Sequence, residues 1–161
     1  MERTQLHLAL GSNQGDREAN LLRAVEALDE GLGVRHSALS AFRTYPAWGF
    51  DGAAFLNGTV RYEIPQAGQD PQLFALAVMD LAKSIERSLG RTGEAETDAS
   101  GQRVYHDRPI DIDLLFYGSL RMTTPRLTLP HKLMKERDFV MEPLQQTATP
   151  WLRAQFPEIF D

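Results

Sequence analysis

A strict alternation of apolar and acidic side chains restricts the fold of this chain more than any other feature of its sequence. In Ile110-Asp111-Ile112-Asp113-Leu114 the character of the side chain changes at every residue, which is the period of a β-strand. The three apolar side chains therefore share one face, which we expect to lie on a core. The two aspartates share the other face, roughly 7 Å apart at their Cα atoms. We therefore expect a sheet with one buried face and a carboxylate pair on the opposite face.

The rest of the chain supplies the partners of this strand. Apolar alternation and flanking turn residues predict four strands, over 5–10, 36–44, 55–64 and 109–117. Apolar stripes at helical spacing predict two helices, over 17–30 and from about 70 to 90. The order strand, helix, strand, strand, helix, strand is that of an α+β, ferredoxin-like βαββαβ sandwich with an antiparallel sheet and helices on one side. After Gly118 we expect a C-terminal arm over 120–130 and one or two short helices.

Size and composition fit one domain over residues 1–161. The chain is 42% hydrophobic and 24% charged, a usual balance for a globular protein that buries a core. It contains no cysteine, which excludes disulfides and thiolate chemistry and fits a cytoplasmic location. The apolar run near the N-terminus is too short for a signal peptide or a membrane span. A net charge of −5 disfavours nucleic-acid and membrane partners, and we expect a monomer.

The acidic average conceals a basic segment around the aspartate pair. Residues 83–137 carry ten Lys and Arg against eight acidic residues, a local charge of +2, whereas the remainder carries seven against 14, or −7. Arg108 lies just upstream of the aspartates, and Pro130-His131-Lys132 opens a second basic group that ends at Arg137. Carboxylates beside guanidinium groups suit Mg²⁺ and a phosphate ligand. The alternative is that these side chains only solvate the surface.

Two further motifs have a structural and a functional interpretation. The segment 44–49 and Phe55-Leu56-Asn57 bring aromatic faces and an amide together in a predicted hairpin. They either pack in the core or stack on a flat ligand and bond to its edge. Gly11-Ser12-Asn13 is either a turn and helix cap or a turn that holds an anion. It lacks the glycine pattern of dinucleotide-binding folds and of P-loops.

Taken in order, these motifs resemble the hydroxymethyl-dihydropterin pyrophosphokinase family of folate biosynthesis. The similarity runs through 10–13, 42–44, 55–57, 85–86, 89–91, 108–113, 127–131 and 134–137, and so covers nearly the whole chain. The resemblance implies a ferredoxin-like fold. It also implies transfer of the diphosphate of ATP to the hydroxymethyl group of 6-hydroxymethyl-7,8-dihydropterin, with release of AMP. ATP is then the co-substrate, and two Mg²⁺ ions are implied as cofactors.

The resemblance implies a role for each matching position. Asp111 and Asp113 are implied to hold Mg²⁺, while Arg91 and Arg108 brace the transferring phosphates, and these four form the implied catalytic set. The implied ATP contacts are Glu86, Arg91, Arg108, Ile112, Arg126, Thr128, His131, Lys132 and Arg137. The implied pterin contacts are Thr44, Tyr45, Ala47, Phe55, Asn57, Tyr105 and Phe139. Of these, Phe55 and Phe139 are implied to stack on the two faces of the ring.

The sequence departs from the family pattern at three positions. Lys132 stands where tyrosine is expected, Lys83 replaces an amide one turn before Glu86, and Asp107 precedes Arg108 where proline or serine is usual. The polar segment 92–107 is longer than in familiar bacterial relatives, in which this loop is expected to close over the ligands. Within that segment, Arg103 is the one candidate for a further arginine of the family.

Two other functions stay open on the sequence alone. The first is a different Mg²⁺-dependent phosphoryl- or nucleotidyl-transfer enzyme that uses the same aspartate pair. Its products separate it from the family reaction, because a simple kinase makes ADP and this family makes AMP. The second is a ferredoxin-like module that binds a small molecule without chemistry. Such a module does not need the aspartates, so Asp111→Ala leaves its ligand affinity nearly unchanged.

Overall fold

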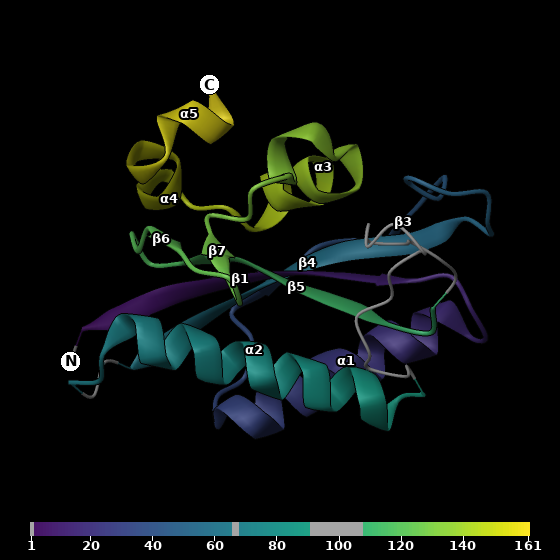
Figure 1. Cartoon of the computed structure of the whole chain (residues 1–161), viewed down its shortest axis with the longest axis horizontal. Coiled ribbons are helices and arrows are strands. Elements are labelled where there is room, and N and C mark those ends of the chain that lie inside the picture. The colour runs from purple at the N-terminus through teal and green to yellow at the C-terminus, as the bar shows by residue number, and fades with distance from the viewer. Residues whose placement is uncertain (1, 66–67, 91–107) are drawn as a thin grey trace.

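The computed structural model of the chain describes residues 2–65, 68–90 and 108–161. Its sheet contains β1 (Arg3–Ser12), β2 (Ala38–Leu39), β3 (Arg43–Tyr45), β4 (Phe55–Pro65) and β5 (Asp111–Tyr117). The strand order is β2-β4-β1-β5, with β3 also paired to β4, and each of these pairings is antiparallel. The predicted ferredoxin-like arrangement is confirmed (Figure 1).

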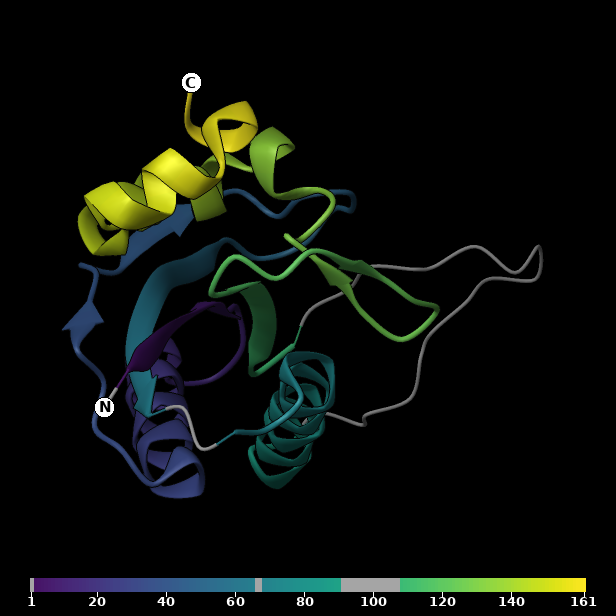
Figure 2. The same ribbon diagram turned by 90° about the vertical axis from the view of Figure 1, so that its left-hand side faces the viewer.

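Two long helices, α1 (Arg17–Leu32) and α2 (Pro71–Ser88), cover one face of this sheet (Figure 2). Both helices begin and end within two residues of their predicted bounds. Their starts are marked in the sequence because each helix follows an aspartate whose side chain accepts a backbone N–H. Alternate leucines of β1 are fully buried beneath them, and Ile112 and Leu114 of β5 belong to the same core. The face of β5 that the sequence assigns to the core is therefore the buried one.

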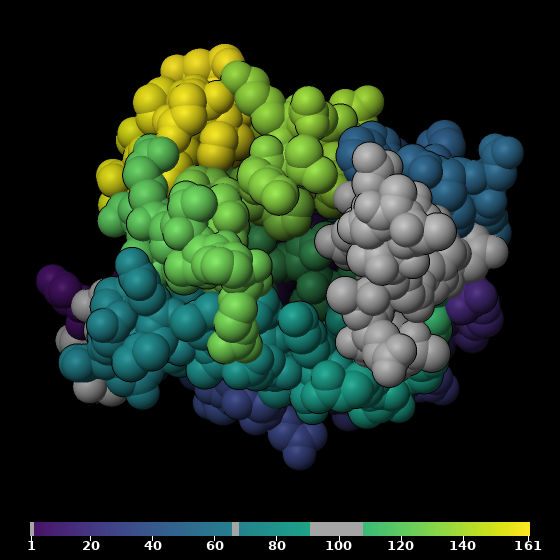
Figure 3. All heavy atoms as spheres, in the orientation of Figure 1, coloured from purple at the N-terminus to yellow at the C-terminus, as the bar shows by residue number. Residues whose placement is uncertain are grey.

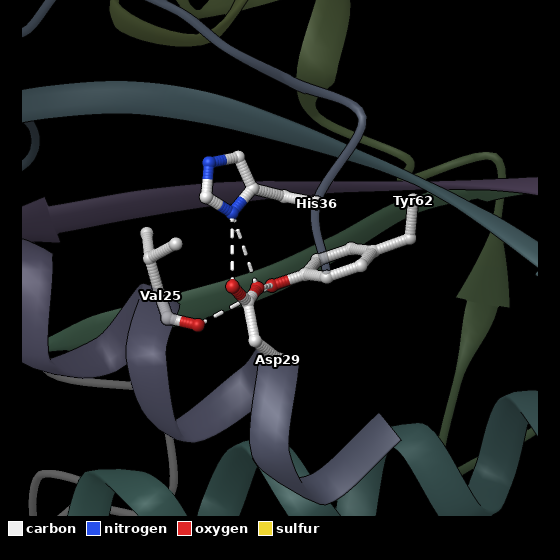
Figure 4. A network of polar contacts seen from close by, with 4 residues as sticks. All are labelled: Val25, Asp29, His36 and Tyr62. Carbon is white, nitrogen blue, oxygen red and sulfur yellow. Dashed lines mark hydrogen bonds and ion pairs between the residues drawn. The ribbon is translucent and has the colours of Figure 1, made fainter. Parts of the chain in front are cut away.

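A polar network ties α1 to β4 at the end of this core (Figure 4). The hydroxyl of Tyr62 donates to Asp29 Oδ1 at 2.6 Å, and His36 Nδ1 lies 3.0 Å from Asp29 Oδ2. Burial, followed by the bond to Asp29, raises the pKa of Tyr62. Since Tyr62 is completely buried, this pairing satisfies the one polar atom that its ring brings into the core.

The single strand predicted over 36–44 is wrong, because the structure has two short strands there. The register with β4 moves by one residue between Leu39↔Val60 and Arg43↔Asn57, which is the mark of a bulge. The hydroxyl of Ser40 accepts the N–H of Thr59 at 2.8 Å. It thus takes a ladder bond that a strand carbonyl would otherwise accept, and the strand is interrupted.

The chain after β5 covers the second face of the sheet (Figure 1). It contains a hairpin of β6 (Met122–Thr123) and β7 (Thr128–Leu129), a 3₁₀ turn, η1 (Met134–Glu136), and the helices α3 (Asp138–Thr147), α4 (Pro150–Gln155) and α5 (Pro157–Phe160). As expected, α1 and α2 of the βαββαβ unit lie on one side of the sheet, but the segment after Gly118 contains three helices where one or two were expected. Prolines conceal these helices in the sequence: two stand at first-turn positions, where proline is tolerated, and Pro143 lies inside α3.

This C-terminal layer is held by a seam of polar and aromatic contacts. Thr147 of α3 bonds to the hydroxyl of Thr59 at 2.8 Å, and its carbonyl accepts from Arg61 at 2.7 Å. The ring of Phe116 lies 5.0 Å from Phe156. Trp151 of α4, by contrast, is 43% exposed. Among the described residues, no helix is long and apolar enough to cross a membrane.

Candidate active site

A cavity of about 260 Å³ lies on the second face of the sheet, where β4 and β5 approach the C-terminal layer. In Figure 3 the atoms of β5 are visible at the bottom of a hollow between that layer and α2. The cavity is lined by Pro46, Trp48, Phe50, Phe55, Asn57, Arg108, Asp111, Asp113, His131, Lys132, Leu133, Arg137 and Phe139. Nine of these are predicted site residues, and they come from two separate parts of the chain, 55–57 and 108–139.

The strand alternation carries the predicted side chains to one face. The side chains of Asp111 and Asp113 are 25% and 27% exposed, whereas Ile112 between them is buried. On β1, Gly11 stands in register between Asn57 of β4 and Asp111 of β5. A Cβ at Gly11 would lie 2.6 Å from Asn57 Nδ2. The glycine therefore leaves open the floor between the amide and the carboxylates.

Each aspartate faces a buried arginine. Arg108 Nη1 lies 3.6 Å from Asp111 Oδ1, and Arg137 Nη1 lies 3.9 Å from Asp113 Oδ2. The arginines are only 4% and 6% exposed, so the cavity wall presents two cations whose charge is poorly screened by water. This arrangement can hold an anion while the carboxylates bind a cation beside it.

The donor set fits Mg²⁺. This ion takes one or two carboxylates and completes its shell with phosphate oxygens and water, and Asp111 and Asp113 offer such a pair at the cavity wall. No group of three or more His, Asp or Glu side chains placed to hold a metal is found within the described ranges. The pair therefore suits a metal that arrives with a phosphate ligand better than an all-protein metal cage.

Asn13 joins two walls of the site. Its Oδ1 accepts the N–H of Arg108 at 2.7 Å, and its own N–H donates to the carbonyl of Arg108 at 3.1 Å. Its Nδ2 donates to the carbonyl of Ala53 at 2.9 Å, and Arg17 holds the carbonyl of Ala54 at 3.0 Å. The turn after β1 thus fixes both the entry to β5 and the end of the loop 46–54. The Gly11-Ser12-Asn13 motif was the sequence signal for this role. Its partners, the backbone groups of Arg108 and Ala53, lie far along the chain, so no local pattern predicts them.

Glu86 and Ile112 lie behind the cavity rather than on its wall. Glu86 of α2 is 7% exposed, and its Oε2 accepts the N–H of Ile112 at 2.8 Å. The side chain of Ile112 points into the core. Glu86 thus fixes the backbone of β5 at the residue between the two aspartates.

Three of the predicted pterin contacts surround a neighbouring hollow. Thr44, Tyr45 and Ala47 line a space of about 450 Å³ on the other side of Pro46 and Phe50, which line both spaces. Burial and a 2.8 Å hydrogen bond to Glu142 raise the pKa of the Tyr45 hydroxyl to about 12. The structure therefore does not bring these three residues to the cavity that holds Phe55, Asn57 and Phe139.

The remaining predicted residues do not line the cavity or cannot be placed. Arg126 is ion-paired at 2.6 Å with Asp80 of α2, and Thr128 lies in the β6–β7 hairpin opposite Thr123. Arg91 and Tyr105 lie outside the described residues, as do Arg103, Asp107 and the segment 92–107.

Four residues of the cavity wall were not among the predicted contacts: Pro46, Trp48, Phe50 and Leu133. The loop 46–54 belongs to neither a helix nor a strand, so no periodicity indicates which of its side chains point inward. The ring of Phe50 meets that of Phe55 edge-on at 6.3 Å. Aromatic density in 45–55 was the one signal available, and it does not separate core packing from a ligand wall.

Comparison with known proteins agrees with this geometry. The family model for 7,8-dihydro-6-hydroxymethylpterin-pyrophosphokinase matches residues 7–149. The chain belongs to this family. It is 40% identical over 154 residues to the 2-amino-4-hydroxy-6-hydroxymethyldihydropteridine pyrophosphokinase of Porphyromonas gingivalis, covering 94% of this chain and 95% of that relative. It is 38% identical over 146 residues to the protein of the same name in Methylorubrum extorquens, covering 90% and 83%.

A solved structure supports the fold alone. The chain is similar to an HPPK-DHPS protein in complex with substrates, with a TM-score of 0.59 and 13% identity. The match covers 98% of this chain and 43% of the solved chain, so this chain spans less than half of that longer protein.

Proposed function

We propose that this chain transfers the diphosphate of ATP to the hydroxymethyl group of 6-hydroxymethyl-7,8-dihydropterin, with release of AMP. One observation carries the proposal: in a member of the pyrophosphokinase family, a single cavity joins an aromatic and amide wall to a wall of carboxylates and buried arginines. The first wall suits a flat heterocycle and the second suits a polyphosphate with its metal. The scissile phosphate and the accepting hydroxyl would meet between them.

The pterin is proposed to lie between Phe55 and Phe139, with Asn57 at its edge. Asn57 is 6% exposed, and its Oδ1 has no hydrogen-bond partner within the described part of the chain. Its Nδ2 donates to the carbonyl of Leu10 at 3.4 Å. A buried amide oxygen without a donor costs free energy that a ligand N–H recovers. A pterin presents such N–H groups at the edge of a flat ring, which the two phenylalanines can cover.

The nucleotide is proposed to bind along the basic wall. Arg108 and Arg137 supply planar guanidinium groups for phosphate oxygens, with His131 and Lys132 beside them. Asp111 and Asp113 would hold Mg²⁺, which when bound offsets phosphate charge and stabilises the attacking and leaving oxygens. The low exposure of both arginines strengthens their attraction for the phosphates, and their ion pairs orient the carboxylates.

The other implied roles stay predictions of this proposal. They are the use of two Mg²⁺ ions, a monomeric cytoplasmic protein that acts as one domain over 1–161, the absence of a nucleic-acid partner, and contacts from Thr44, Tyr45, Ala47, Glu86, Arg91, Tyr105, Ile112, Arg126 and Thr128.

A product assay tests the proposed function. The purified chain is incubated with ATP, 6-hydroxymethyl-7,8-dihydropterin and Mg²⁺, and nucleotide products are separated by ion exchange. We expect AMP and the pterin diphosphate in equal amounts, and neither when the pterin is omitted or Mg²⁺ is chelated. Formation of ADP, or of AMP at the same rate without pterin, would contradict the proposal.

A further inference from the structure

Arg137 is held in the cavity wall in an unusual way. It is 6% exposed, and its Nε is buried with no hydrogen-bond partner within the described residues. Its ion pair with Asp113 is long, at 3.9 Å. A buried guanidinium is normally fixed by several short charge-assisted hydrogen bonds. Arg137 therefore needs another source of orientation.

Two aromatic rings supply that orientation. The Cζ atom of Arg137 lies 4.6 Å from the ring centroid of Trp48 and 5.6 Å from that of Phe139. Tryptophan gives the strongest attraction of this kind, and the attraction grows when water is excluded. A ring face fixes the plane of the guanidinium without using its N–H groups. The N–H groups thus remain directed at whatever anion enters the cavity.

Trp48 also connects this arginine to the pterin wall. It lies in the loop between β3 and β4, which contributes Pro46 and Phe50 to the cavity. The far end of the same loop is fixed by Asn13 through the carbonyl of Ala53. The position of the loop and the plane of the Arg137 guanidinium are therefore linked through one ring contact.

We propose that Trp48 is a positioning residue that holds the guanidinium of Arg137 in the plane that receives a nucleotide phosphate. The inference rests on the proposed function for the identity of the anion. It adds a residue of the cavity wall that acts on the nucleotide through Arg137. Loss of the ring face frees Arg137 to rotate, so nucleotide binding weakens although the charge is still present.

The test compares an aromatic with an aliphatic replacement. Affinity for Mg²⁺ and α,β-methylene-ATP is measured by titration calorimetry, together with the KM for ATP and kcat, in Trp48→Leu and Trp48→Phe. We expect Trp48→Leu to weaken binding about 10-fold and Trp48→Phe about 2- to 3-fold, because phenylalanine keeps a smaller π face. Trp151→Leu, a half-exposed tryptophan on α4, is the matched control and should bind as the wild type does.

A second background separates positioning from packing. In Arg137→Gln the guanidinium is gone, so adding Trp48→Leu should cost less than about 2-fold in affinity. The inference is overturned if Trp48→Leu binds like the wild type, if Trp48→Phe is as weak as Trp48→Leu, or if the loss persists in full in the Arg137→Gln background. Because the ATP analogue is not turned over, these affinities decide the role of Trp48 even if the product assay finds no AMP and the proposed function fails.

Discussion

The two faces of the sheet are built from the same strands and serve different ends. On β1, Leu6, Leu8 and Leu10 are at most 1% exposed beneath α1 and α2. Their neighbours Gln5, His7, Ala9 and Gly11 face the C-terminal layer and the cavity. The helix-covered face has a single role, which is to bury apolar side chains away from water. The other face carries a second, smaller apolar cluster under the C-terminal layer and, at the cavity, polar groups whose partners come from far along the chain.

The difference extends to how polar atoms are satisfied. On the helix-covered face, the Tyr62 hydroxyl is paired with Asp29. At the cavity, Asn57 Oδ1 and Arg137 Nε are buried without hydrogen-bond partners among the described residues. A folded chain tolerates such groups where a ligand will pair with them, because the cost in the free protein is offset on binding. The core under α1 and α2 is thus expected to determine stability and the cavity to determine function, and substitutions can separate the two.

The largest difference between an effect on activity and an effect on stability is expected at Asp113. Asp113→Ala removes one of the two carboxylates that would hold the metal, and we expect turnover to fall by about 10³-fold, since metal binding supplies several kcal/mol of transition-state stabilisation. The side chain is 27% exposed, so the midpoint of thermal unfolding should change by only a few degrees. Steady-state AMP formation and a melting curve on the same preparation check both expectations. Wild-type turnover in this variant would remove Asp113 from the metal site.

At Leu8 we expect the opposite result, a loss of stability with activity retained. Leu8 lies next to Ala9, the register partner of Asp113. Leu8 is fully buried in the core under α1 and α2. Leu8→Ala leaves a cavity there and should lower the free energy of unfolding by about 3 kcal/mol. At a temperature well below its unfolding midpoint, kcat should stay within about 2-fold of the wild type. Urea unfolding measures the first quantity, and a large fall in kcat of the folded variant would show that the two faces are not independent.

The sequence predicted the helix-covered face well because its signals are local. Alternation in β5 and helical stripes in α1 and α2 depend on residues a few positions apart, and capping aspartates mark both helix starts. The break between β2 and β3 depends on Ser40 meeting Thr59, a contact between distant residues. The C-terminal layer depends on pairs such as Thr59 with Thr147, and its helices contain or begin at prolines, so local patterns predicted only an arm and one or two short helices there.

The candidate site was predictable to the extent that strands carry it. Asp111, Asp113, Phe55 and Asn57 share a face because the pleat has a period of two. The loop 46–54 has no period, so Trp48 and Phe50 were not among the predicted contacts, and the predicted contacts Thr44, Tyr45 and Ala47 line the neighbouring hollow. The family resemblance assigned Arg126 to the nucleotide, and the structure adds that Arg126 is ion-paired with Asp80 of α2.

The smallest expected effect concerns how His7, a buried histidine on the second face, makes the free energy of unfolding depend on pH. His7 is fully buried, and burial, followed by the charge of Arg61, lowers its pKa to about 3. An unfolded chain protonates it near pH 6.5, so its contribution to stability is complete above that pH and declines as the pH falls toward 3. Between pH 6.5 and pH 5 the loss is about 2 kcal/mol. The free energy of unfolding of the wild type, His7→Leu and His7→Gln is measured by urea unfolding at several pH values across this range. In both variants it should fall with pH by about 2 kcal/mol less than in the wild type. An unchanged slope in both variants would mean that the folded protein protonates His7 as readily as the unfolded chain does.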